Sequence, residues 1–407
     1  MASWTDLPSD LLISISDRLD ILSCLRCSAV CTTWASTIRP RLPTLPLFCL
    51  EQPIPWLLLY AGASKYDPDH TDFIFYNLTT ATSYCIPSLI PFSSIERARF
   101  LGSNSGWLVC TNIKYQLHLI SPLTGTKHLL PCIKRPHGYQ GDLTVLWGSE
   151  GNSFNWDSLE KVIICRVNEH CSGSDTGLLL LGLFWPHGLA VLKVGDDKWT
   201  WLDLKRHYKD ALIYRGKIYA MATHTLCCWK LEGCSFRAEK ALTIRNSMLN
   251  SLTKYLVEYR GKLMMVCRDS EWRNPGNKIR VYNLDLDHRD RLWSPVNNIG
   301  DNAVFIGPGY SRIASIVGLH GIQGNCIYYT DDHYAHKLNC CGYRYHNSGI
   351  YNLKKGTYEP FPIDYIQPPI WFWPCDVKQH SSNSGLFIYL VMYFFLLFFS
   401  IVLSLIN

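Results

Sequence analysis

The chain has 407 residues, more than one hydrophobic core usually serves, so we expect at least two structural units. Its 47% hydrophobic and 18% charged residues exclude an intrinsically disordered chain. The net charge of +6 is spread along the sequence, whereas nucleic-acid binding needs clustered cations, so no nucleic-acid partner is expected. The densest basic stretch is interrupted by acidic and aromatic residues and consists of Lys205, Arg206, Lys209, Arg215 and Lys217.

The first forty residues predict three short helices. Asp6-Leu7-Pro8-Ser9-Asp10 combines polar capping residues, a proline and acids, which are typical of a helix start, so a first helix is expected from about residue 8 to 19. A second helix is expected after Asp20, and a third from near Cys27 until Pro40 stops it. The apolar residues of the first helix recur at steps of three and four, which predicts one common face: Leu11, Leu12, Ile15 and Leu19.

Three helices of this size bury too little apolar surface to be stable alone, so they need a partner. The pattern Leu7-Pro8-x-x-Leu11-Leu12-x-x-Ile15, followed by Leu25-Arg26 and Val30-Cys31-x-x-Trp34, resembles the F-box family. The resemblance assigns residues 1–42 to an F-box and implies docking onto a Skp-type adaptor, which bridges to a cullin. The alternative is a small helical cap packed on the main domain. The residues expected at or beside the adaptor are Leu7, Pro8, Leu11, Leu12, Ile15, Val30 and Trp34.

The 17 cysteines are an odd number, and no basic segment followed by an apolar run marks a secretory signal. Cys110 and Cys165 lie in apolar runs, where a reduced thiol behaves as a small hydrophobe, so a cytosolic or nuclear protein is expected. The spacing Cys24-x-x-Cys27-x-x-x-Cys31 could suit a metal, but no fourth ligand follows nearby, and no metal or cofactor is expected.

From about residue 45 to 375 the sequence predicts an almost all-β domain. Short β-prone runs alternate with Gly, Asn, Asp and Pro, at the intervals of an all-β fold. The clearest runs are 73–76, 107–110, 117–120, 162–165 and 262–266.

Internal repeats favour a propeller. Tyr-Arg-Gly-Lys occurs at 214–217 and again at 259–262, a separation of 45 residues, which fits one propeller blade. In both copies Arg-Gly lies between β-prone runs, as a hairpin turn requires. Tyr-Asn-Leu recurs at the end of three β-prone runs: 76–78, 282–284 and 351–353. We expect six or seven irregular blades, with a pair of β-sandwiches as the alternative.

Several ordered motifs resemble the plant-specific domain of unknown function 295, the kelch-like domain of the F-box group that includes the kink-suppressor proteins. The motifs are Ser121-Pro122-Leu123-Thr124-Gly125, Val281-Tyr282-Asn283-Leu284-Asp285, and the segments 299–307 and 324–332. The resemblance implies a kelch-like β-propeller that follows the F-box and recognises a protein substrate.

No enzyme signature is present among the motifs considered. The sequence has no Gly-x-Ser-x-Gly elbow, phosphate-binding glycine loop or His-Glu-x-x-His. The acids Asp331-Asp332 and Asp285-x-Asp287 are interpreted as turn residues rather than glycosidase carboxylates. The same applies to a group without a common zinc spacing: His333, His336, Cys340, Cys341 and His346.

The C-terminal segment 385–406 carries no charge, and 22 residues of helix would span roughly 33 Å, enough for a bilayer core of about 30 Å. It follows a polar stretch, 376–384, that is interpreted as a linker. We expect a tail anchor that keeps the preceding domains on the cytosolic face of a membrane; the alternative is an incorrectly assigned gene end.

The predicted function is that of a substrate-recognition subunit of an SCF-type ubiquitin ligase. Other subunits would transfer ubiquitin, so this chain needs no catalytic residue. The alternative is a non-catalytic propeller that binds or scaffolds partners and carries a vestigial F-box.

Overall fold

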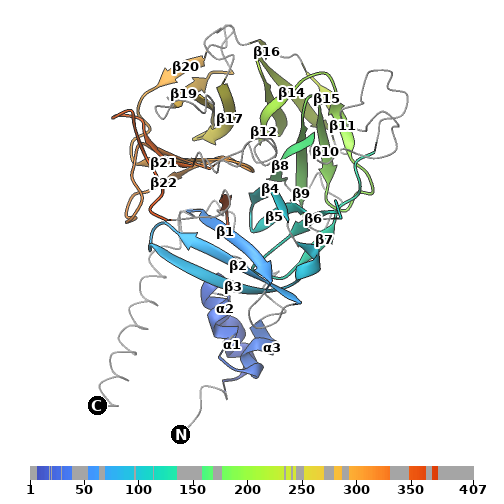
Figure 1. The fold of residues 1–407 in the computed structure, drawn as a ribbon, viewed down its shortest axis with the longest axis vertical. Helices are drawn as coiled ribbons and strands as arrows, with labels where there is room; N and C mark the ends of the chain where they lie inside the picture. Colours follow the sequence, from blue (N-terminus) through green and yellow to red (C-terminus); the bar gives the residue numbers. More distant parts are fainter. Residues whose placement is uncertain are drawn as a thin grey trace, which may run out of the picture. The chain divides into compact units, whose positions relative to one another are not determined.

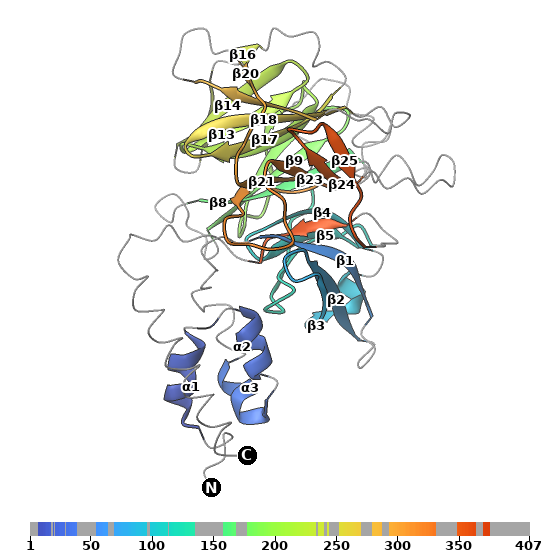
Figure 2. The same ribbon diagram turned by 90° about the vertical axis from the view of Figure 1, so that its left-hand side faces the viewer.

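The structure is a computed structural model. Apart from a few single positions and pairs, it describes residues 7–38, 54–63, 69–134, 158–167, 177–243, 252–269, 279–286, 293–330, 348–363 and 369–374. The N-terminal part contains three helices (Figure 2): α1 (Ser9–Ser16), α2 (Ile21–Ser28) and α3 (Thr32–Ile38).

The three predicted helices are present, but two of their bounds differ from the expectation. Helix α1 ends at Ser16 rather than near residue 19. Helix α3 begins at Thr32 rather than near Cys27, because α2 continues to Ser28 and Cys27 belongs to it. The Sγ of Cys31 accepts a hydrogen bond from the backbone N–H of Trp34 at 3.5 Å, so a thiol occupies the place of the usual capping hydroxyl.

The remainder forms six β-sheets, called blades 1 to 6 in chain order. Blade 1 contains β26 (Ile370–Phe372), β1 (Trp56–Ala63), β2 (His70–Asn77) and β3 (Thr82–Pro91) in this spatial order. A short 3-10 helix, Phe92–Ser94, leads to blade 2, with β4 (Arg99–Asn104), β5 (Trp107–Thr111), β6 (Leu117–Ile120) and β7 (Lys127–Leu129). Blade 3 contains β8 (Leu159–Arg166), β9 (Leu178–Phe184), β10 (Leu189–Lys193) and β11 (Thr200–Asp203).

Blade 4 contains β12 (Tyr208–Tyr214), β13 (Lys217–Ala222), β14 (Thr225–Glu232) and β15 (Ser235–Ala238), with β16 (Leu242–Thr243) also paired to β14. Blade 5 contains β17 (Leu252–Tyr259), β18 (Lys262–Asp269), β19 (Ile279–Leu284) and β20 (Trp293–Val296). Blade 6 has the order β22 (Arg312–Ser315), β21 (Asn302–Ile306), β23 (Cys326–Tyr329), β24 (Gly349–Asn352) and β25 (Thr357–Glu359), and its β21 and β23 run parallel.

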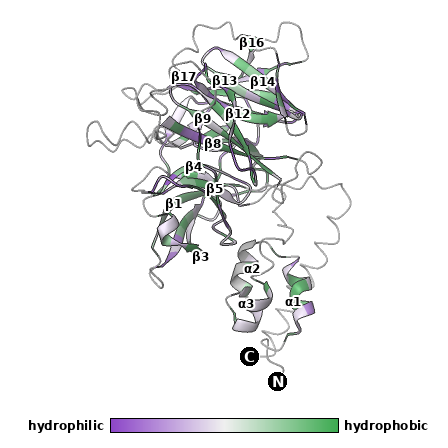
Figure 3. Ribbon diagram, turned by 90° about the vertical axis from the view of Figure 1, so that its right-hand side faces the viewer, coloured by the Kyte–Doolittle hydropathy of each residue, from purple (hydrophilic) through white to green (hydrophobic). Residues whose placement is uncertain are grey.

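The blades follow one another around a ring (Figure 1). Strand β26 contacts β4, β4 contacts β8, β8 contacts β12, β12 contacts β17, and β17 contacts β22. These contacts define a propeller of six blades, and they rule out the pair of β-sandwiches. Hydrophobic residues run along many of the strands (Figure 3), and separate clusters of buried side chains lie between successive blades.

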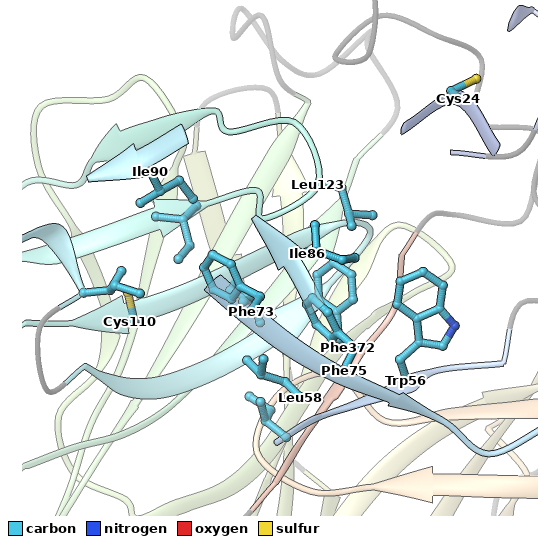
Figure 4. Close-up of a cluster of buried hydrophobic side chains, with 14 of the residues drawn as sticks. Cys24, Trp56, Leu58, Phe73, Phe75, Ile86, Ile90, Cys110, Leu123 and Phe372 are labelled. Atoms are coloured by element: carbon cyan, nitrogen blue, oxygen red, sulfur yellow. The ribbon is translucent and has the colours of Figure 1, made fainter. Parts of the chain in front are cut away.

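Blade 1 closes the ring with strands from both ends of the β domain. Strand β26 pairs antiparallel with β1, so that Leu57 lies opposite Trp371. The aromatic rings behind this pairing lie close together (Figure 4): the centroids of Phe75 and Phe372 are 4.8 Å apart, and those of Trp56 and Phe75 are 5.7 Å apart. The last described strand is therefore an integral part of the first blade.

Backbone segments from blades 2, 3 and 6 approach one another closely at Gly102. A Cβ atom added at Gly102 of β4 would lie 1.8 Å from the carbonyl oxygen of Val162 in β8, so only glycine fits there. From blade 6, Tyr310 donates its backbone N–H to the carbonyl of Ser103 at 3.3 Å. The Tyr310 side chain packs against the clusters of blades 3, 4 and 5. The segment between β21 and β22 therefore crosses the axis of the propeller.

The repeats mark equivalent places in the blades, as predicted. Both Tyr-Arg-Gly-Lys copies form the hairpin turn between the first two strands of a blade, β12–β13 and β17–β18. Two of the Tyr-Asn-Leu copies lead from the third strand of a blade to the fourth, and the copy at 351–353 lies at the end of β24. The Oδ1 of Asn77 accepts the N–H of Thr79 at 2.9 Å, and the Oδ1 of Asn352 accepts the N–H of Lys355 at 2.9 Å.

Within the described part of the chain, no helix has both the length and the apolar character needed to cross a membrane. The predicted linker 376–384 and tail 385–406 lie outside the described residues. The anchor therefore stays a prediction, and extraction of membranes with carbonate would test it. Release of the full-length chain into the soluble fraction would contradict it.

Candidate adaptor-binding surface

Helix α1 starts at a proline that serves as its N-cap. Pro8 has φ −56° and ψ 141°, outside the helical region, and its carbonyl accepts the backbone N–H of Leu12 at 3.0 Å. The sequence predicted Pro8 inside the first turn of the helix, whereas Pro8 lies one position before that turn. Asp10 follows in the first turn, where its negative charge opposes the positive end of the helix dipole. Pro8 is exposed, so its ring is accessible to a partner.

Two of the seven residues expected at the adaptor belong to the core of the helical unit. Leu12 is 1% exposed and Trp34 9% exposed, and both are buried together with Cys24 and Ile38. Cys24 also donates its thiol to the carbonyl of Ser16 at 3.3 Å. Leu12 and Trp34 therefore hold the three helices together. Sequence reasoning missed Cys24 and Ile38 as core residues.

The other five residues of the expected set are at least partly accessible. Leu11 is 50% exposed and Val30 is 55% exposed, and both are large apolar side chains on a small unit. Leu7 and Ile15 are half-buried. Leu11 and Leu12 differ in exposure because successive residues of an α-helix point about 100° apart, and here Leu12 is the one that faces the core. The accessible apolar surface of the unit thus contains Leu7, Pro8, Leu11, Ile15 and Val30.

Two buried charged residues from blades 3 and 4 bind each other. Lys161 of β8 and Asp210 of β12 form an ion pair at 2.9 Å, with side chains 7% and 1% exposed. The second oxygen of Asp210 accepts the backbone N–H of Leu256 in β17 at 2.7 Å. Burial raises the pKa of the Asp210 carboxyl, and Lys161 opposes that shift. One carboxylate therefore joins three successive blades, and its role is structural.

The predicted basic stretch is divided between the two ends of β12. Lys205 and Arg206 precede the strand, while Arg215 and Lys217 follow it at the hairpin turn. The cations therefore do not form one continuous patch.

Among the described residues, no group of three His, Cys, Asp or Glu side chains could hold a metal ion. The segment from Asp331 to His346 lies outside them.

The comparisons with known proteins agree with this architecture. The F-box domain matches residues 4–43, and the KIB1-4 beta-propeller matches residues 75–352. The chain therefore belongs to the KIB1-4 beta-propeller family and carries an F-box at its N-terminal end.

Its relatives include F-box proteins of Arabidopsis thaliana. F-box protein SKIP23 is 23% identical, with 77% of this chain and 80% of the relative covered. F-box protein At2g05970 is 19% identical, with 92% and 96% covered. Among solved structures, the N-terminal domain of Nup159 is 7% identical, covers 59% of this chain and 61% of its own, and has a TM-score of 0.32.

Proposed function

We propose that this chain is the substrate-recognition subunit of an SCF-type ubiquitin ligase. The F-box would dock onto a Skp-type adaptor, and the propeller would hold a protein target. The observation that carries the proposal is the exposure of Leu11 and Val30 on a helical unit that is followed by a folded propeller. Large apolar side chains that a small unit leaves accessible are typical of interface anchors.

In this proposal, two sets of F-box residues would have different roles. Leu12 and Trp34 maintain the helices, while Leu11 and Val30 are available for an apolar groove of the adaptor. The adaptor would connect the chain to a cullin, and the ligase subunits bound there would transfer ubiquitin. The kelch-like character of the propeller, inferred from motif resemblance, is part of the same proposal.

Adaptor binding tests the proposal. The double variant Leu11→Asp, Val30→Asp places two charges on the exposed apolar surface and should weaken binding of a purified Skp-type adaptor by at least tenfold, since one lost anchor costs about 1–2 kcal/mol. Val317→Asp is the matched control, because Val317 is 65% exposed but lies in the propeller. Wild-type binding no tighter than that of the double variant would contradict the proposal and favour a scaffold with a vestigial F-box.

A further inference from the structure

Equivalent loops of blades 2 and 3 lie on the same face of the ring (Figure 1). Their innermost strands run parallel, because Gly102 of β4 lies against the carbonyl of Val162 in β8. Two positions further along both strands, Nδ2 of Asn104 donates to the carbonyl of Ile164 at 2.8 Å. The loops that join the second strand to the third, β5–β6 in blade 2 and β9–β10 in blade 3, therefore lie at the same end. We call this end of the propeller the β5–β6 face.

Large apolar side chains are exposed at the β5–β6 face. Tyr115 in the β5–β6 loop is 58% exposed, and Trp185 in the β9–β10 loop is 39% exposed. Leu129 is 63% exposed at the end of β7, where it pairs with His118 near the start of β6. Single exposed apolar residues are common on protein surfaces, whereas several large ones at one face mark an interaction surface.

The β5–β6 loop holds Tyr115 in one place. Oδ1 of Asn112 accepts the backbone N–H groups of Lys114 and Gln116, each at 3.0 Å. The Asn112 carbonyl accepts the N–H of Tyr115 at 2.9 Å. Tyr115 has a φ of +55°, which bulky residues rarely adopt and which asparagine or glycine would suit better. The turn itself therefore does not require tyrosine, and an aromatic side chain on a fixed turn loses little freedom on binding.

Blade 2 carries positive charge only. No acidic residue occurs between Glu96 and Asp142, and Lys114 is exposed directly before Tyr115. The stretch contains six cations: Arg97, Arg99, Lys114, Lys127, Lys134 and Arg135. An exposed apolar surface on such a blade is complementary to an apolar group with negative charge beside it.

The described acids nearest to blade 2 at this face belong to the neighbouring blades. Asp69 precedes β2 in the equivalent loop of blade 1. In blade 3, Glu160 pairs with His207 at 2.8 Å, and Asp203 accepts the hydroxyl of Tyr208 at 2.7 Å. The charges on both sides are therefore mixed, and the purely positive part of the face is blade 2.

We propose that Lys114, Tyr115, Leu129 and Trp185 bind a segment of the protein substrate in which an apolar side chain is flanked by acidic residues. This inference rests on the proposed function, because it specifies the face of the propeller and the class of target sequence. The apolar side chain would pack against the exposed rings and Leu129, and the flanking carboxylates would face Lys114 and the other cations of blade 2.

The test uses the full chain in complex with a Skp-type adaptor. Three fluorescein-labelled Gly/Ser peptides serve as probes. The first has a phenylalanine flanked by two glutamates on each side, the second has lysines in place of the glutamates, and the third has serine in place of the phenylalanine. Fluorescence anisotropy should show about tenfold tighter binding of the first peptide than of either other peptide. A labelled single-stranded DNA should also bind more weakly than the first peptide.

Two variants separate the apolar and the charged contributions. Tyr115→Asn, Leu129→Ser should lower the affinity for the first peptide about tenfold, because it removes two anchors. Its melting temperature should equal or exceed that of the wild type, since asparagine suits the positive φ and Leu129 is exposed. Lys114→Glu keeps the apolar side chains and should weaken binding of the glutamate peptide while strengthening binding of the lysine peptide.

The control is Val317→Ser, which removes a side chain that is 65% exposed at the opposite face. Val317 follows β22, and Gly321 shortly after it lies against the carbonyl of Leu78, at the turn between the third and fourth strands of blade 1. This variant should bind the first peptide like the wild type.

Four outcomes would each overturn the proposal: no binding of the first peptide, equal binding of all three peptides or of the DNA, an equal loss in Val317→Ser, or a lower melting temperature in the double variant. Adaptor binding is measured in the same samples and should be normal in every variant. Failure of this proposal is therefore distinct from failure of the proposed function.

Discussion

The helical unit and the propeller use their apolar residues in different ways. In the helices, Leu12, Cys24, Trp34 and Ile38 form a small core, while Leu11 and Val30 remain exposed. In the propeller, successive blades bury their facing sides against one another, and the backbones of β4 and β8 approach closely at Gly102. A unit that leaves large apolar side chains exposed is suited to bind a partner, whereas a closed ring buries its apolar strands between its own blades.

The largest expected effect comes from opening the ring. Truncation after residue 368 removes β26 and its contacts to β1, so the chain should lose cooperative unfolding altogether. Truncation after residue 376 keeps β26 and is the matched control. Differential scanning calorimetry would compare the two. Equal transitions in both would show that blade 1 does not need its C-terminal strand.

The buried ion pair should be the next most sensitive point of the propeller. Asp210→Asn leaves the buried Lys161 side chain without its counter-ion, which typically costs about 3–5 kcal/mol. Asp197→Asn, at an exposed turn of blade 3, is the control and should change stability by less than about 0.5 kcal/mol. Urea unfolding would measure both. An unchanged midpoint for Asp210→Asn would contradict the role given to the pair.

Two adjacent leucines of the F-box should respond differently to substitution by alanine. Leu12→Ala removes a buried side chain and should destabilise the helical unit by about 2–5 kcal/mol. Leu11→Ala should change stability by less than about 0.5 kcal/mol while weakening adaptor binding. Circular dichroism at 222 nm and adaptor titration would separate these effects. A loss of helix content in Leu11→Ala would show that Leu11 is a core residue.

The smallest effect concerns pH. Lys254 is fully buried, donates to the carbonyl of Thr223 at 2.9 Å, and has its pKa lowered by burial from the usual 10.5. Between the lowered pKa and 10.5 the unfolded chain binds more protons, so this lysine makes stability rise with pH. Lys254→Met should therefore gain stability relative to the wild type at neutral pH, and the difference should shrink as pH approaches 10.5. Urea midpoints at several pH values test this, and a constant difference would contradict it.

The sequence predicted the parts of the fold that depend on local patterns. The hairpin turns at Arg215-Gly216 and Arg260-Gly261 were predicted from a repeat, and strands such as β5 and β8 were predicted from β-prone runs. The pairing of β26 with β1 joins residues far apart in the chain, and no local pattern encodes it. The passage of Tyr310 across the axis is equally non-local.

The candidate site was predicted only in part, because exposure depends on helix geometry rather than on residue type. The F-box pattern named Leu11 and Leu12 together, yet one is half exposed and the other buried. The late start of α3 depends on the Cys31 thiol as a cap, which residue preferences for capping do not anticipate.

In the proposed function, the F-box delivers proteins held by the propeller for ubiquitination. The most direct measurement compares cells that express the wild-type chain with cells that express Leu11→Asp, Val30→Asp, and follows the half-life of the proteins that co-purify with both. We predict that these proteins still bind the variant and become longer-lived, to the extent seen when the proteasome is inhibited. Half-lives that are the same with both chains would contradict the claim and leave a binding protein without a degradative role.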